Sequence, residues 1–200
     1  VEKFLNQTLD SFVCDEAVMK KFEVIVVDDG SKDNTAKIGK EYADKYPDTF
    51  RVISKENGGH GSTINCGIRN AVGKYFKVVD GDDWVNTADF VKLVEDLEKT
   101  ESEYVFTNYN EYYDDVNRQK AVDFPQFKDG TEYDFADVAN KVYIPMHALV
   151  IKTSVLKDNN IVIDEKCFYV DVEYVMFPVP FVNKVTFFDL HVYMYRLALS

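Results

Sequence analysis

Three carboxylates crowd into four residues at Asp80-Gly81-Asp82-Asp83, directly after the apolar segment 75–79. Like charges this close repel one another unless a cation or protons intervene. Mg²⁺ and Mn²⁺ take oxygen ligands and commonly bridge one or two carboxylates to substrate phosphates. The segment therefore predicts a divalent metal site formed by Asp80, Asp82 and Asp83. The alternative for the tetrapeptide alone is an acidic turn exposed to water.

A second acidic pair, Asp28-Asp29, ends another apolar, β-branched run, 22–27, and is followed by Gly30. Between the two acidic segments lies 56–62, which holds three glycines in seven residues and therefore predicts a loop with close backbone approach. Each acidic pair by itself also fits turn chemistry. Two acidic strand ends in one sheet, with a glycine loop between them, favour a shared site over two unrelated turns.

The elements that must position these residues alternate between strand and helix along the first half of the chain. Such alternation predicts an α/β fold with a Rossmann-like, mostly parallel sheet flanked by helices, whose ligands bind beyond the carboxyl ends of the strands. Segment 109–128 is aromatic and acidic without steady periodicity, which predicts a hairpin or loop over one side of the sheet. Helices are expected at 1–12, 33–46, 62–72, 88–99, 154–157 and 171–177, and strands at 22–27, 50–54, 75–79, 104–108, 148–152, 185–188 and 192–195.

Charge and composition exclude several classes of protein. A formal net charge of −12 disfavours a nucleic-acid binder, because such proteins need a basic surface to replace phosphate counterions. The longest apolar runs, such as 22–27 and 175–182, are far shorter than the roughly 20 residues of a membrane span. With three widely spaced cysteines and no recognisable leader, we expect a cytoplasmic location, with any contact at the inner face of a membrane made by parts outside this chain.

The segment Val26 to Thr35, VVDDGSKDNT, resembles the nucleotide-binding signature of family 2 glycosyltransferases. Residues 56–62 and 80–83 resemble that family's glycine loop and DxD motif, in the same order and spacing. The resemblance runs from the opening helix to Tyr195-Arg196, nearly the whole chain. It implies the GT-A fold and a metal-dependent hexosyltransferase that uses a nucleoside-diphosphate sugar, expected to be uridine-linked. The implied acceptor is a hydroxyl on a glycan, lipid-linked or protein-linked molecule, in glycan or cell-surface polysaccharide synthesis.

The resemblance also assigns roles to the motif residues. In a single domain, residues 1–108 would bind the nucleotide sugar, and residues 109–200 would form a region of mixed strand pairing that binds the acceptor. Asp80 and Asp82 would hold the Mg²⁺ or Mn²⁺ ion and the donor, with Asp83 supporting them. The implied donor-binding residues are Asp28, Asp29, Asn57, Gly58, Gly59, His60 and Asp80.

The usual reaction of the family inverts the anomeric carbon, so a base must deprotonate the acceptor hydroxyl opposite the leaving diphosphate. The family places this base at the start of a late helix, where Asp171 matches the family aspartate. Val170 stands where a glutamate is often found, which keeps Glu173 as a second candidate. The structural alternative for Asp171 is an N-terminal helix cap.

Two histidines and two other functions remain open. His147, just before the strand expected at 148–152, could face the acceptor, whereas His191 suggests no role. An apolar strand that ends in DxD is also typical of haloacid-dehalogenase-type phosphotransferases, in which Asp80 would be the nucleophile. Against this, that motif normally opens its domain, and no later lysine and acidic set follows in order. A non-catalytic nucleotide-sugar binding module is the other alternative.

The family fold begins with an apolar strand just before the helix that is expected at 1–12. Without it, the strand at 22–27 would lose a parallel neighbour and expose backbone donors and acceptors. The expectation is that the natural polypeptide extends beyond Val1 and also continues past Ser200.

Overall fold

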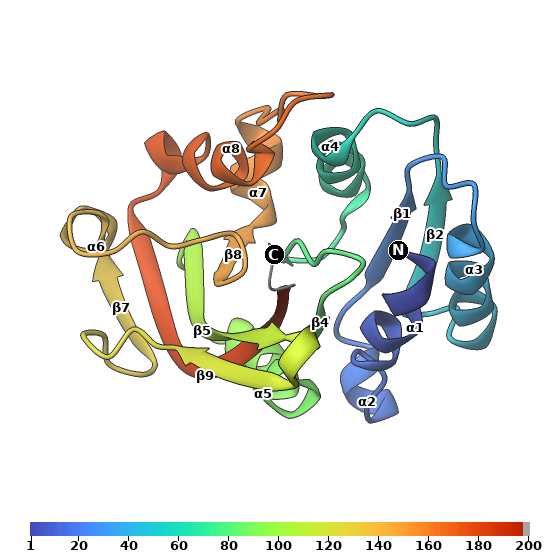
Figure 1. The fold of residues 1–200 in the computed structure, drawn as a ribbon. Helices are drawn as coiled ribbons and strands as arrows, with labels where there is room; N and C mark the ends of the chain where they lie inside the picture. Colours follow the sequence, from blue (N-terminus) through green and yellow to red (C-terminus); the bar gives the residue numbers. More distant parts are fainter. Residues whose placement is uncertain (198–200) are drawn as a thin grey trace.

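The computed structural model describes residues 1–197, which form two sheets with helices on both sides (Figure 1). Strands β1 (Val24–Asp28) and β2 (Phe50–Ser54) pair in parallel and make the first sheet. Helix α3 (Thr35–Lys45) connects them, as a parallel pair requires. Gly39 lets α3 approach closely, because a Cβ there would lie 3.1 Å from Val52 and 3.2 Å from Val26.

The second sheet has seven strands among the described residues, in the order β3-β8-β5-β9-β4, with β6 beside β5 and β7 beside β9. Strands β5 and β9 pair in parallel, and the other pairs are antiparallel. The bounds are β3 (Tyr75–Phe76), β4 (Trp84–Val85), β5 (Tyr104–Tyr113), β6 (Arg118–Val122), β7 (Thr131–Asp134), β8 (Leu149–Lys152) and β9 (Lys184–Leu197). The α/β fold class is confirmed, and the mixed pairing of the second sheet agrees with the mixed region predicted for the second half of the chain.

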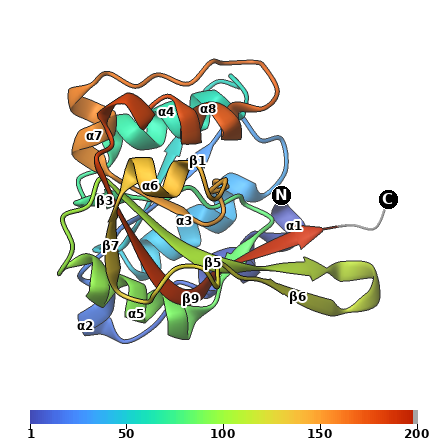
Figure 2. The same ribbon diagram turned by 90° about the vertical axis from the view of Figure 1, so that its left-hand side faces the viewer.

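Helices cover both faces of the second sheet (Figure 2). Neighbouring residues of β5 point to opposite faces, so Tyr104 and Phe106 enter one core and Val105 enters the other. The first core also contains side chains of α4 (His60–Asn70), α6 (Phe135–Ala139), α7 (Thr153–Asp158) and α8 (Val170–Met176). The second core contains side chains of α1 (Glu2–Asp10), α2 (Glu16–Met19) and α5 (Thr87–Leu97).

Most predicted elements are present, and the differences have local causes. The segment 109–128 contains a hairpin, in which β5 turns into β6 through a 3₁₀ turn at Asp114–Val116; another such turn is at Val179–Phe181. The strands expected at 185–188 and 192–195 form one strand, β9, whose pairing with β5 shifts register around Asn108. The strand expected at 75–79 pairs only at Tyr75 and Phe76. Among the described residues, no helix is long and apolar enough to cross a membrane.

A cavity of about 680 Å³ lies between β1 and the segment that leads from β3 to the acidic turn at residues 80–83. Apolar side chains of α1 and α5, such as Leu9 and Leu93, contribute to its lining. Strand β1 pairs with β2 along one edge, and no strand of the described residues pairs with its other edge. The two sheets are therefore joined by packing and not by a continuous ladder of hydrogen bonds.

Candidate active site

The glycine loop is built around the carboxylate of Asp29. Its Oδ1 accepts hydrogen bonds from Nζ of Lys55 at 2.6 Å and from the amide of Gly58 at 2.9 Å, and its Oδ2 accepts one from the amide of Gly59 at 2.8 Å. Burial acts to raise the pKa of Asp29, but Lys55 and the two amides outweigh it and hold that pKa below its usual range. Sequence reasoning missed Lys55, which supplies the positive charge beside this partly buried carboxylate.

Asp28 and Asn57 both form hydrogen bonds with the backbone of the turn that follows β1. Asp28 is 5% exposed, and its Oδ1 accepts a hydrogen bond from the amide of Ser31 at 3.0 Å. The side-chain amide of Asn57 donates to the carbonyl oxygen of Asp29 at 3.0 Å. The structure therefore brings these predicted donor-binding residues together, and their contact with a nucleotide stays a prediction.

Glycines let the loop contact the segment that precedes α8. Gly59 has a φ of +83°, a left-handed value that favours glycine. A Cβ at Gly61 would collide with the carbonyl oxygen of Asp164. The amide of Lys166 also donates to the carbonyl oxygen of Gly58 at 3.1 Å. These contacts bring residues separated by about a hundred positions in the sequence to one side of the site.

His60, the first residue of α4, lies against the acidic cluster. Its Nε2 is 3.2 Å from Oδ1 of Asp80. The hydrogen bond with Asp80 raises the pKa of His60 against the effect of burial, and the charges of Asp171 and Asp82 add to the rise. The glycine loop, the strand end and the start of α8 therefore share one electrostatic environment.

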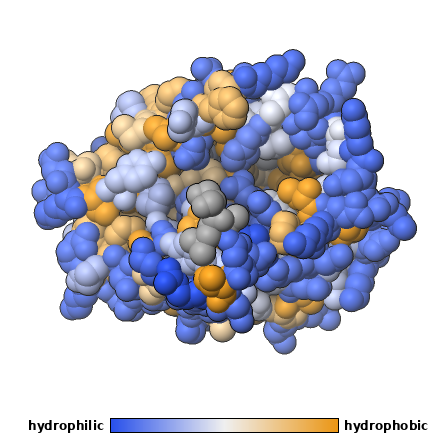
Figure 3. Space-filling model, viewed as in Figure 1, coloured by the Kyte–Doolittle hydropathy of each residue, from blue (hydrophilic) through white to orange (hydrophobic). Residues whose placement is uncertain are grey.

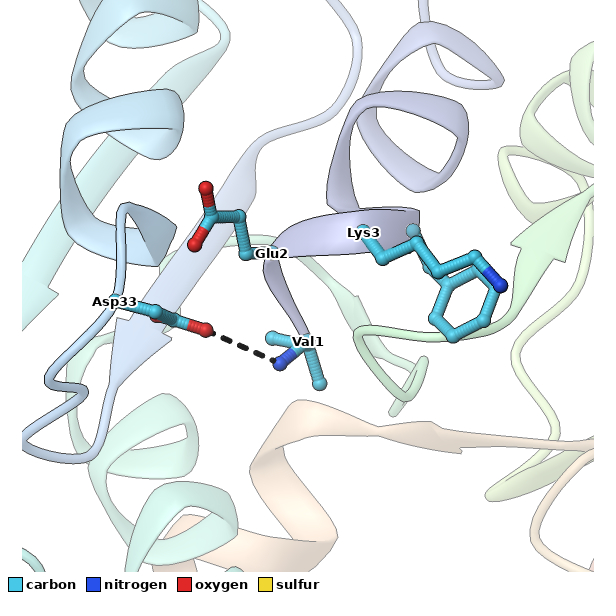
Figure 4. Close-up of a pocket in the computed structure, with 5 residues that line it drawn as sticks. Val1, Glu2, Lys3 and Asp33 are labelled. Atoms are coloured by element: carbon cyan, nitrogen blue, oxygen red, sulfur yellow. Dashed lines mark ion pairs between the residues drawn. The ribbon is translucent and has the colours of Figure 1, made fainter.

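Helix α1 is hydrogen-bonded to the backbone of the acidic turn. The hydroxyl of Thr8 donates to the carbonyl oxygen of Asp83 at 2.5 Å and lies 3.1 Å from the carbonyl oxygen of Gly81. At the start of the helix, the carboxylate of Glu2 accepts hydrogen bonds from the backbone amide of Asn34 at 3.1 Å and from its side-chain amide at 2.6 Å, next to Asp33 in Figure 4. This is why the opening helix is part of the site although none of its residues was predicted to be.

Asp83 ties the acidic turn to β9. Its Oδ2 accepts the hydroxyl of Tyr193 at 2.6 Å, and its Oδ1 accepts the amide of Arg196 at 2.7 Å. Burial raises the pKa of Asp83 to about 7, and the charges of Asp80 and Asp82 act in the same direction. A buried carboxylate with this pKa needs a partner charge in order to ionise fully at neutral pH.

The Arg196 side chain clamps the same turn. Its Nε donates to the carbonyl oxygen of Asp82 at 2.7 Å, and its guanidinium lies 4.7 Å from the ring centroid of Trp84. Tyr195-Arg196 ends the sequence resemblance, but no role was assigned to either residue. The position of Arg196 depends on the register of β9, which the sequence pattern did not show.

Asp80, Asp83 and His147 form a group that fits a divalent cation. One carboxylate oxygen from each aspartate and a ring nitrogen of His147 lie within 4.8 Å of one another. Carboxylate oxygens suit Mg²⁺ and Mn²⁺, and imidazole is a common ligand of transition metals. Of the predicted set, the structure brings Asp80 and Asp83 together, and Asp82 lies outside this group.

Asp171 is the second residue of α8, and it does not cap that helix. The N-cap is Tyr169, which has a left-handed φ of +65°. Burial and the charge of Asp171 raise the pKa of Tyr143, and Asp171 also contributes to the raised pKa of His60. The carboxylate therefore acts on the same site as Asp80, and the helix-cap interpretation is wrong.

Glu173, the second candidate base, has a structural contact. Its Oε2 accepts a hydrogen bond from the amide of Asp164 at 2.8 Å. This bond holds the segment that packs on the glycine loop. Glu173 thus supports the loop, and Asp171 is left as the better candidate for proton transfer.

A family model described as glycosyl transferase family 2 matches residues 1–159. The chain belongs to glycosyl transferase family 2. This membership accounts for the glycine loop and the acidic strand end as parts of one site, and it does not favour the haloacid-dehalogenase alternative for Asp80.

Curated relatives support the same family. The chain is 38% identical over 105 residues to the uncharacterized glycosyltransferase EpsJ of Bacillus subtilis, a match that covers 52% of this chain and 30% of that protein. It is 32% identical over 103 residues to the minor teichoic acid biosynthesis protein GgaB of the same organism, with 52% and 11% covered. The chain thus spans less than a third of the length of these two relatives.

Solved structures show the same fold. The structure of TarS 1-349 from S. aureus in complex with UDP-GlcNAc matches with a TM-score of 0.80 and 23% identity, over 100% of this chain and 56% of that one. The mannosyltransferase PcManGT from Pyrobaculum calidifontis, in complex with GDP-Man and Mn²⁺, matches with a TM-score of 0.66 and 17% identity, over 96% and 52%. This chain therefore has the GT-A glycosyltransferase fold.

The remaining histidines of this family 2 domain differ in their surroundings. His191 Nε2 lies 2.6 Å from Oδ1 of Asp123. His147 lies among tyrosine rings, and burial lowers its pKa to about 4. His147 is therefore a neutral imidazole inside the site, which the sequence suggested only by its place before a strand.

Proposed function

We propose that this domain catalyses metal-dependent transfer of a sugar from a nucleoside-diphosphate sugar, most simply a uridine-linked one, to a hydroxyl acceptor with inversion. The observation that carries the proposal is that His60 Nε2 lies 3.2 Å from Asp80 and that the charge of Asp171 also acts on the pKa of His60. The glycine loop supplies His60, the strand end supplies Asp80, and the start of α8 supplies Asp171. Such an arrangement is what a reaction between a bound diphosphate and an incoming hydroxyl needs.

Each segment has a distinct task in this proposal. Asp28 and Asp29 shape the loop that would receive the nucleotide, and Asn57, Gly58 and Gly59 form its backbone. Asp80 and Asp83 would hold Mg²⁺ or Mn²⁺, with Asp82 as a further predicted ligand. When bound, the cation neutralises charge on the diphosphate leaving group.

Asp171 carries the proton transfer in this proposal. Its carboxylate takes the proton of the acceptor hydroxyl while the acceptor oxygen bonds to the anomeric carbon and the bond to the diphosphate oxygen breaks. Attack from the side opposite the diphosphate inverts that carbon. Asp171 is partly exposed, which leaves room for an acceptor to reach its carboxylate.

Exposed apolar side chains lie beside Asp171. Phe168 is 90% exposed and Tyr169 is 80% exposed, and Val172 and Met176 of α8 are also exposed. Figure 3 shows hydrophobic residues gathered on this part of the surface. Exposed apolar patches of this kind commonly mark interaction sites, which supports an acceptor surface formed by residues 109–200.

The names of the similar proteins support a broader biological setting. GgaB is named for teichoic acid biosynthesis, and TarS was solved with UDP-GlcNAc. We infer that this domain works in glycan or cell-surface polysaccharide synthesis on a glycan, lipid-linked or protein-linked acceptor. We also propose a cytoplasmic location, with any membrane contact made by other parts of the protein.

The experiment that tests the proposal is a thermal-stability screen of nucleotide sugars with Mn²⁺ present. Uridine-linked donors should raise the melting temperature in a saturable manner, and EDTA should abolish the rise. Stabilisation with no turnover of any donor would indicate the non-catalytic binding module. The absence of stabilisation by every nucleotide sugar would contradict the proposed function.

A further inference from the structure

His147 is fixed beside the acidic turn by the second sheet. It lies two residues before β8, and β8 runs antiparallel to β3 with Phe76 opposite Ile151. Nζ of Lys77 donates to the carbonyl oxygens of His147 at 2.7 Å and Leu149 at 3.2 Å. The backbone of His147 is thus held against the segment that leads into Asp80.

Three tyrosine rings set the orientation of the imidazole. The ring of His147 stacks on Tyr195 with centroids 3.9 Å apart, meets Tyr193 edge-on at 5.0 Å and lies 5.8 Å from Tyr109. Within residues 1–197, no hydrogen bond is made by either ring nitrogen. The packing therefore fixes the ring by its faces and leaves its nitrogens available to a ligand.

The spacing between the ring and the two carboxylates suits an intervening ion. A ring nitrogen of His147 lies within 4.8 Å of oxygens of Asp80 and Asp83, but no hydrogen bond or ion pair joins it to either one in the described part of the chain. Metal–ligand bonds to nitrogen or oxygen are about 2.0–2.2 Å long, so two ligands of one ion lie roughly 3–4 Å apart. Small adjustments of these side chains would bring all three to one cation.

We propose that His147 is a ligand of the same divalent cation that Asp80 and Asp83 hold. The inference rests on the proposed function, because that cation is the one that the donor diphosphate would share. It adds a ligand that is distant in the sequence to Asp80 and Asp83, whereas the neighbouring Asp82 lies outside this group. A site with one imidazole and two carboxylates favours Mn²⁺ or Co²⁺ over Mg²⁺, because nitrogen ligands strengthen binding of transition metals.

Pulsed electron paramagnetic resonance of bound Mn²⁺, with and without UDP, tests the inference directly. A coordinated imidazole nitrogen couples to the electron spin of the ion, so the unaltered protein should show a ¹⁴N signal. His147→Gln should remove this signal and weaken Mn²⁺ binding at least about tenfold. Co²⁺ binding should weaken more than Mg²⁺ binding. A circular dichroism melt of the variant checks that it is folded.

His60→Gln and His191→Gln are the matched controls. His60 lies 3.2 Å from Asp80 and is the other imidazole that could give the signal, and His191 lies outside the site. Both variants should keep the ¹⁴N coupling. Bound Mn²⁺ without nitrogen coupling, or coupling that survives in folded His147→Gln, would overturn the assignment of His147 while leaving the proposed metal dependence intact. Failure of Mn²⁺ to bind the unaltered protein at all, even with UDP, would overturn both.

Discussion

His60 Nε2 lies 3.2 Å from Oδ1 of Asp80, so an ion pair joins the glycine loop to the acidic strand end. The two side chains are 40% and 30% exposed. A pair this exposed contributes at most about 1 kcal/mol to stability. Its importance is positional, because it places the first turn of α4 beside the carboxylate that is expected to bind the cation.

Asp80 and Asp82 should differ in their effect on metal-dependent donor binding. Asp80→Asn removes a ligand from the group formed with Asp83 and His147, whereas Asp82 lies outside that group. We expect Asp80→Asn to abolish Mn²⁺-dependent UDP binding and Asp82→Asn to weaken it less. Isothermal calorimetry with UDP, in Mn²⁺ and then in EDTA, measures both. Equal UDP affinity with and without chelator would show that the metal assignment is wrong.

Asp29 should stabilise the fold through the glycine loop. Asp29→Asn removes a charged acceptor of bonds from Lys55, Gly58 and Gly59, and such bonds are worth about 1.5–3 kcal/mol to a charged group. We expect the free energy of unfolding in urea at pH 7 to fall by about 1–3 kcal/mol. Asp48→Asn, at an exposed position, is the control and should change little. Equal losses in the two variants would rule out a special role for Asp29.

The same contacts predict how this stabilisation depends on pH. The pKa of Asp29 is lower in the folded protein than the ordinary value of 3.8, so the unfolded chain binds more protons in that range. The contribution of ionised Asp29 to the free energy of unfolding is complete above the unfolded pKa of 3.8. It is lost as the pH falls through the lower pKa of the folded state. The difference in unfolding free energy between the unaltered protein and Asp29→Asn should therefore narrow in acid. A difference that is constant down to pH 2 would contradict this.

The acidic and glycine segments of the site could be predicted because their chemistry is local. Asp29 and Asp80 follow apolar runs and both border the same cavity, although β1 and β3 belong to separate sheets and not to the single sheet that was predicted. Their partners were not predictable in this way. His147 reaches Asp80 only because β8 lies antiparallel to β3, and that pairing is not encoded in any short pattern.

The limits of hydrophobic periodicity also explain why some predicted strand boundaries were wrong. Asp189 and His191 are polar residues that suggested a break between two strands. The register shift around Asn108 accommodates them within one strand, with Asn108 donating to Asp189 at 2.7 Å. The short β3 has a similar origin, because Val78 and Val79 border the cavity beside β1 and lack a strand partner there within residues 1–197.

An additional strand between the two sheets should stabilise this domain. The cavity of about 680 Å³ is bordered by Val1 and by the edge of β1 that pairs with no strand within residues 1–197. A polypeptide that carries an apolar strand joined ahead of Val1 should melt at a higher temperature and bind UDP more tightly. Each side chain buried there would contribute about 1.5–3 kcal/mol, in addition to the hydrogen bonds of β1.

The matched control is an extension of equal length with serine and aspartate at the positions that face the cavity. It should give little increase in the melting temperature measured by calorimetry. The contrary result is that residues 1–200 alone melt as cooperatively and bind UDP as tightly as the polypeptide with the apolar strand. That result would show that no added strand occupies the cavity.

The central claim is that Asp171 activates the acceptor of a nucleotide-sugar transfer. The most direct test is the rate of UDP release from the UDP-sugar that stabilises the protein best, in Mn²⁺, for the unaltered protein, Asp171→Asn and Glu173→Gln. Loss of a general base lowers the rate by about 10²-fold or more, so Asp171→Asn should be nearly inactive while calorimetry shows unchanged donor binding. Glu173→Gln, which can still accept the bond from Asp164, should lose far less. Near-normal UDP release by Asp171→Asn, or no release by the unaltered protein, would contradict the account.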